Sequence, residues 1–79
     1  MDVTKYLIEH VEKGKKDLKG IDHSIAEFAS MNNLPIGEMY HIMSIYFAAN
    51  LNSTLASHCI DKRNKIEDFY NTHAGDTEI

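Results

Sequence analysis

The fold is decided by residues 35–47, which read PIGEMYHIMSIYF. Proline suits the first turn of a helix, so a helix is predicted to begin near Pro35. From there apolar residues recur at steps of three and four almost to the end of the chain, which is the period of an α-helix. This apolar stripe consists of Ile36, Met39, Tyr40, Met43, Tyr46, Phe47, Leu51, Leu55, Cys59, Ile66 and Phe69.

The sequence leaves open whether residues 35–72 form one helix or two. Residues 50–54, NLNST, are poor in helix formers, and Ser53 could cap a second helix. A single rod would span roughly 50 Å at ~1.5 Å per residue, more than a compact domain of this size can cover by itself. In the last part, two pairs of opposite charges four residues apart favour an exposed helical face. These pairs are Asp61 with Lys65 and Arg63 with Glu67.

A first helix is predicted over residues 3–13. Asp2 is a suitable N-cap, and apolar residues at helical spacing follow it. Beyond residue 13 the helix either ends or extends through Leu18, because Gly20 suits a C-terminal cap.

A second helix is predicted over residues 25–32. Ser24 and Glu27 have the spacing of a capping box, in which each side chain satisfies an orphaned backbone donor. Asn33 tolerates left-handed backbone angles, and Pro35 follows it, so the chain turns here before the next helix.

Residues 24–43, SIAEFASMNNLPIGEMYHIM, resemble the helix-turn-helix of DNA-binding regulators. The resemblance covers a quarter of the chain. It implies a small residue where the two helices cross, an apolar residue after the turn and buried positions on the second helix. The residues at the matching positions are Ala29 at the crossing, Asn33 where the turn usually holds glycine, Leu34 after it, and Met39 and Ile42 on the second helix.

The predicted fold is therefore all-α, with three to four helices, a central helix-turn-helix-like hairpin and a long C-terminal helix or helical pair. Seventy-nine residues suffice for one domain and not for two, so residues 1–79 are expected to form a single helical domain. Residues 75–79 are expected to be a flexible tail.

DNA reading is the alternative function that the resemblance implies. In such regulators the early residues of the second helix contact base edges and phosphates. Of the residues at these positions, only Tyr40 and His41 suit that task. The candidate phosphate contacts are Lys13, Lys15, Lys16 and Lys19, and no Lys or Arg lies between Gly20 and Asp61.

Protein binding is the leading interpretation. Residues 39–49 are apolar nearly all round, because Ile42 and Ile45 widen the stripe. A small monomer has few elements to cover such a helix, so a twofold homodimer is predicted. Flexible Met and amphipathic Tyr also suit a surface that receives another protein. The predicted interface residues are Met39, Tyr40, Ile42, Met43, Tyr46 and Phe47.

No pattern points to catalysis, a metal or another cofactor. The five histidines are 13 to 18 residues apart, so no two share a helical turn, and no paired cysteine accompanies them. His58 and Asp61 share a face, but two ligands are too few for a zinc site. Cys59 fits the apolar stripe as a core residue. We therefore expect no enzyme activity.

The sequence thus predicts a small noncatalytic regulatory or inhibitory protein that acts through another protein. No apolar stretch reaches ~18 residues and no signal peptide is evident, so we expect no membrane contact and a cytoplasmic location. The single Cys59 requires no oxidising compartment. A short, acidic chain with net charge −4 is also typical of viral and mobile-element accessory proteins.

Overall fold

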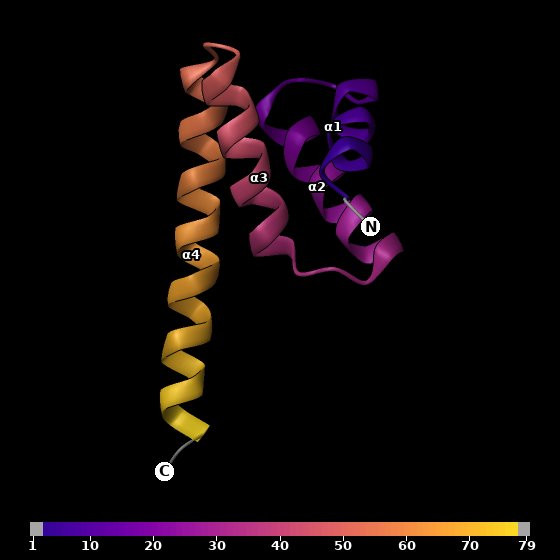
Figure 1. Cartoon of the computed structure of the whole chain (residues 1–79). Helices are drawn as coiled ribbons and strands as arrows, with labels where there is room; N and C mark the ends of the chain where they lie inside the picture. Colours follow the sequence, from indigo (N-terminus) through magenta and orange to yellow (C-terminus); the bar gives the residue numbers. More distant parts are fainter. Residues whose placement is uncertain (1–2, 78–79) are drawn as a thin grey trace.

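The computed structural model describes the backbone of residues 3–77 and the side chains of residues 3–71. The described part contains four helices: α1 (Thr4–Lys13), α2 (Leu18–Asn32), α3 (Ile36–Ala49) and α4 (Ser53–Thr77). This confirms the all-α prediction, and residues 35–72 form two helices rather than one. α3 and α4 run antiparallel side by side, and α1 and α2 pack against each other and against α3 (Figure 1).

α1 agrees with the predicted helix over residues 3–13. Its N-cap is Val3, which makes no side-chain cap hydrogen bond. The predicted cap, Asp2, lies outside the described residues. The helix ends at Lys13 and does not extend through Leu18, which is instead the first residue of α2.

α2 begins earlier than predicted, because Asp17 caps it and Ser24 does not. The Asp17 carboxylate accepts a hydrogen bond from the backbone N–H of Gly20 at 2.7 Å. Ser24 is buried in the middle of α2. Gly20, expected to cap the end of the first helix, therefore lies in the first turn of the second.

The turn between α2 and α3 forms at the predicted residues. Asn33 adopts the left-handed conformation, with φ 53° and ψ 50°. Its N–H donates to the carbonyl oxygen of Ser30 at 3.3 Å, and the N–H of Leu34 donates to that of Ala29 at 2.9 Å. These two bonds satisfy carbonyl groups that the end of a helix leaves open. Pro35 then forms the N-cap of α3.

The turn between α3 and α4 uses the same bonding pattern with leucine in the left-handed position. Leu51 has φ 60°, and the N–H of Asn52 donates to the carbonyl oxygen of Phe47 at 2.8 Å. The side chain of Asn52 then accepts a hydrogen bond from the N–H of Leu55 at 3.2 Å. Asn52 thus takes the capping role that the sequence suggested for Ser53.

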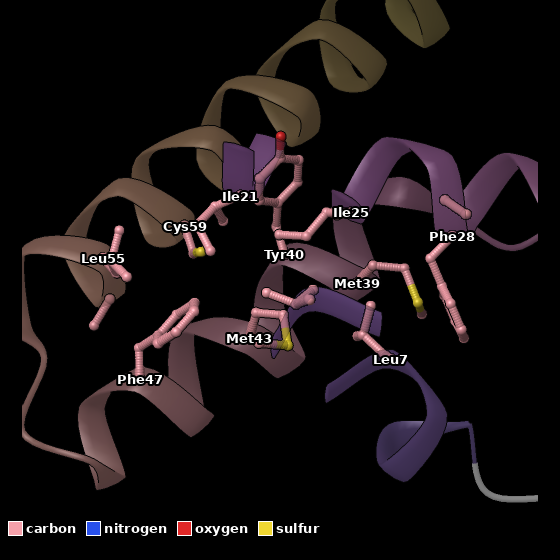
Figure 2. Packing of buried hydrophobic residues seen from close by; sticks show 13 residues of the cluster. Leu7, Ile21, Ile25, Phe28, Met39, Tyr40, Met43, Phe47, Leu55 and Cys59 are labelled. Carbon is pink, nitrogen blue, oxygen red and sulfur yellow. The ribbon is translucent and has the colours of Figure 1, made fainter. Parts of the chain in front are cut away.

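One hydrophobic cluster joins all four helices (Figure 2). Its members are Leu7, Val11, Ile21, Ile25, Phe28, Ala29, Met39, Tyr40, Met43, Phe47, Leu55, Ala56 and Cys59. α3 lies at the centre, so its side chains reach residues from the helices on both sides. Burying a large apolar side chain of this kind contributes roughly 1.5–3 kcal/mol before the entropy cost of folding.

α4 extends past the other helices at its C-terminal end (Figure 1). A Cβ atom added at Gly37 would lie 3.4 Å from Cγ2 of Ile66, so the first turn of α3 lies beside that residue. The chain is 44 Å long, and its radius of gyration, 13.2 Å, exceeds the value of about 12 Å for a compact domain of this length. α4 continues to Thr77, past the predicted start of the tail, and residues 78–79 lie outside the described part.

Candidate functional site

The structure buries four of the six predicted interface residues inside one chain. Met39, Tyr40, Met43 and Phe47 are at most 4% exposed. The prediction assumed that a second copy must cover α3, but α1, α2 and α4 cover it instead. These four side chains are therefore enclosed within a single chain, whereas the sequence analysis placed them at an interface between copies.

The remaining two predicted residues, Ile42 and Tyr46, lie in a groove between α1 and α3. This α1–α3 groove has a volume of about 310 Å³ and is lined by Thr4, Ile8, Ile42, Ile45, Tyr46 and Ala49. Ile45 is 58% exposed. The Tyr46 hydroxyl donates to the Glu12 carboxylate at 3.2 Å, and that carboxylate pairs with Lys16 at 3.0 Å. The six lining side chains carry no charge.

A second groove lies between the start of α3 and the C-terminal half of α4. This α4 groove has a volume of about 400 Å³ and is lined by Ile36, Lys62, Lys65, Ile66, Phe69 and Tyr70. Phe69 and Tyr70 are 58% and 67% exposed. Their rings meet edge to face, with centroids 6.2 Å apart. The charged side chains among these lining residues are Lys62 and Lys65, and both are positive.

A third hollow, also against α4, contains side chains of both charges. Gly37, Glu38, His41, Arg63 and Glu67 line it. Arg63 Nη1 lies 3.0 Å from Nδ1 of His41, and Nη2 donates to the Glu67 carboxylate at 3.4 Å. The Arg63–Glu67 pair is thus formed as predicted. The other predicted pair, Asp61 with Lys65, is not among the ion pairs that residues 3–71 form.

The structure does not bring the predicted DNA contacts onto one surface. Lys15 and Lys19 line a hollow at the start of α2, whereas His41 faces Arg63 in the hollow against α4. Lys13 ends α1, and Lys16 pairs with Glu12. Tyr40 is buried in the core, where it cannot reach a base edge.

Asp22 joins three helices through a polar cluster at the edge of the core. The Tyr40 hydroxyl points out of the hydrophobic cluster (Figure 2) and donates to Oδ1 of Asp22 at 2.8 Å. Nε2 of His58 lies 2.8 Å from the same oxygen, and Nζ of Lys62 lies 3.7 Å from Oδ2. Sequence analysis missed this cluster, because residues 18 and 36 positions apart share no local motif.

The pKa values of three groups at this edge of the core keep Asp22 ionised and Tyr40 and Cys59 protonated at neutral pH. Burial raises the pKa of Asp22, but the hydrogen bonds from Tyr40 and His58 outweigh it and bring the pKa below its ordinary value of 3.8. Burial, followed by the hydrogen bond to Asp22, raises the pKa of Tyr40. Burial raises the pKa of Cys59 to about 11, with the Asp22 charge as a second cause. A thiol of this kind is a poor nucleophile at pH 7.

Two histidines meet one carboxylate between α1 and α2. Nε2 of His10 lies 2.9 Å from Oε1 of Glu27, and Nε2 of His23 lies 3.7 Å from Oε2. Glu27, predicted as part of a capping box, therefore pairs with histidines instead. No group of three or more His, Cys, Asp or Glu side chains within the described residues could hold a metal ion.

Comparison of the chain with protein-family models, with curated proteins and with solved structures gives no match. None of the described helices is both long enough and apolar enough to cross a membrane.

Proposed function

We propose that the chain is a small, noncatalytic, cytoplasmic regulatory or inhibitory protein that acts by binding another protein, and that it does so as a homodimer. The observation that carries this proposal is the exposure of large apolar side chains in two grooves, with Ile45 in one and Phe69 and Tyr70 in the other. Single exposed apolar residues are ordinary, but clustered ones mark interaction sites. Their burial is the main favourable contribution to association.

The α1–α3 groove suits a second copy of the chain. In a twofold interface the same patch lies on both sides, so a charged patch would face its own charge. The lining of the α1–α3 groove is uncharged, although the chain has a net charge of −4. Ile42 and Tyr46 keep their predicted interface role in this proposal, and the exposed Ile45 becomes its centre.

Sedimentation at micromolar concentration tests the dimer. We expect the wild type to sediment as a dimer and Ile45→Asp to sediment as a 9.0 kDa monomer with unchanged helix content, because Ile45 lies outside the core. Met31→Asp is the matched control, since Met31 is 63% exposed on α2 and does not line the groove. A monomeric wild type, or an Ile45→Asp dimer, would refute the proposed interface.

The alternative function, a helix-turn-helix DNA-binding regulator, has one structural feature in its favour. Ala29 and Met39 are buried and Leu34 and Ile42 are partly buried, as the motif requires. Binding to random duplex DNA at increasing salt tests this alternative. Affinity that is micromolar at low salt and falls steeply as salt rises supports DNA binding, and no binding at low salt excludes it.

A further inference from the structure

We infer that the α4 groove is the docking site for an acidic amphipathic helix of a partner protein. The inference rests on the proposed function, in which the chain acts by binding a protein, and it names the chemistry of that partner. It concerns a different surface from the proposed dimer interface, so the two can be tested separately.

The floor of the α4 groove continues the apolar seam along which α3 packs on α4. Leu55, Cys59 and Ile66 recur on one face of α4 at helical spacing, and the first turn of α3 lies beside Ile66. Beyond that point the seam continues with Phe69 and Tyr70, which are more than half exposed. A partner helix placed here would pack on α4 in the same way as α3 packs on the N-terminal part of α4. This is the helix-in-groove mode of recognition.

The charge of the groove selects an acidic partner. Among the residues whose side chains the structure describes, the ionisable groups that line the groove are Lys62, Lys65 and Tyr70, and none of the lining residues is a carboxylate. The Lys62 ammonium lies 3.7 Å from Asp22 at the inner edge, whereas Lys65 is exposed. In the hollow lined by Arg63 and Glu67, by contrast, the chain supplies both charges itself. Carboxylates flanking the apolar residues of a partner would complement the two lysines and set its orientation.

Other occupants fit this surface less well. A second copy placed here by twofold symmetry would bring two pairs of lysines into one interface, without a carboxylate from either groove lining. An anionic lipid surface or a nucleic acid is broader than the groove and would extend to Asp61, Glu67 and Asp68, which are exposed on the same part of α4. A single helix seated in the groove would contact its lining, to which these three carboxylates do not belong.

Selection from a displayed library of random peptides tests the inference. Peptides of about 16 residues are long enough to form a helix when bound. We expect the wild type to select peptides with Leu, Ile or Phe at helical spacing, flanked by Asp or Glu. In fluorescence anisotropy with a selected peptide, Lys65→Glu and Tyr70→Asp should each raise Kd about tenfold or more. Lys5→Glu, which changes an exposed lysine of α1, should leave Kd within about twofold.

Several results would overturn the inference. These are a failure to select any peptide, selected peptides without acidic residues, and a Kd that neither Lys65→Glu nor Tyr70→Asp changes. If the wild type binds anionic vesicles or duplex DNA and Lys65→Glu does not, the inference is also overturned, and the lipid surface or the DNA is the ligand of the groove.

The oligomeric state of the same samples separates this inference from the proposed dimer. An Ile45→Asp monomer that still binds the acidic peptide supports both proposals. A wild-type dimer that selects no peptide refutes docking at the α4 groove and leaves the dimer intact. A monomeric wild type that binds the acidic peptide refutes only the dimer.

Discussion

Oδ1 of Asp22 and Nε2 of His58 lie 2.8 Å apart although 36 residues separate them in the chain. The contact connects α2 to α4, and Tyr40 of α3 donates to the same oxygen. One carboxylate therefore links three helices at the edge of the hydrophobic cluster. Hydrogen bonds to a partly buried carboxylate favour its ionised form, which makes this link sensitive to acid.

Asp22→Asn should destabilise the fold at pH 7 by about 1–3 kcal/mol, because the Tyr40 and His58 donors lose a charged acceptor. In the folded chain the pKa of Asp22 lies below 3.8. The contribution of its charge is therefore present above about pH 4 and is lost as the pH falls through the folded pKa. Urea unfolding between pH 6 and 2 should show the two proteins converging in acid.

The exposed Asp61 of α4 provides the control for this experiment. Asp61→Asn removes the same charge without touching the cluster and should change the free energy of unfolding by less than about 0.5 kcal/mol. A difference between wild type and Asp22→Asn that stayed constant down to pH 2 would contradict the assigned role.

Cys59→Ala should flatten the alkaline limb of the stability curve. The pKa of Cys59 rises from 9.0 to about 11 on folding, so the unfolded thiol ionises first and stability falls between about pH 9 and 11. This loss amounts to about 1 kcal/mol at pH 10. Cys59→Ala should be less stable than the wild type by about 1 kcal/mol at pH 7, because of lost packing, and should not show this additional loss at pH 10. Parallel decline of both proteins in urea unfolding at pH 7 and 10 would contradict the prediction.

Leu51→Gly should stabilise the chain by about 0.5–1 kcal/mol. Leu51 has φ 60° and is 93% exposed, so it carries the strain of the left-handed conformation without gaining burial. That strain costs about 1–2 kcal/mol for a residue with a Cβ atom, and the greater freedom of glycine in the unfolded chain offsets part of the gain. Leu51→Ala keeps the Cβ atom and should not raise the thermal midpoint. An equal rise in both variants would show that the strain is absent.

Alanine should have opposite effects at two glycines. At Gly20 the added Cβ would collide with the carbonyl oxygen of Lys15 and lie 2.8 Å from the capping carboxylate of Asp17, so Gly20→Ala should cost about 1–3 kcal/mol. At Gly37 the Cβ would lie 3.4 Å from Ile66, which allows a gain of up to about 1 kcal/mol from helix propensity. Thermal unfolding of both variants checks the signs, and a shift in the same direction would contradict the argument.

The turns could be predicted because single residues restrict the backbone there. Asn33 and Pro35 marked the turn before α3, and the run at residues 50–54 marked the break before α4. The start of α2 could not be predicted in this way. Asp17 and Ser24 are both good capping residues, so the local sequence does not decide between them. The longer helix brings Ile21 fully into the core, and this burial cannot be read from the local sequence.

The two grooves could not be predicted, because each forms between two helices and the spacing of apolar residues does not show which helices pack together. The apolar stripe correctly located helical faces, but it could not show that α1 packs beside Ile42 and Tyr46 while other helices bury Met43. The α4 groove likewise combines Ile36 with Tyr70, residues from the two ends of an antiparallel pair. Sequence analysis therefore identified the strongly apolar helix and overestimated how much of that helix is accessible.

Every member of the hydrophobic cluster lies between Leu7 and Cys59, well before the end of α4. Phe69 and Tyr70, which follow Ile66 in the described part of α4, can therefore change their side chains without disturbing the packing that holds the four helices together. Substitutions at these two positions would alter the surface of the α4 groove while leaving the ability of the chain to fold intact. The molecule thus combines a closely packed interior with a projecting helical segment whose surface can vary by single substitutions.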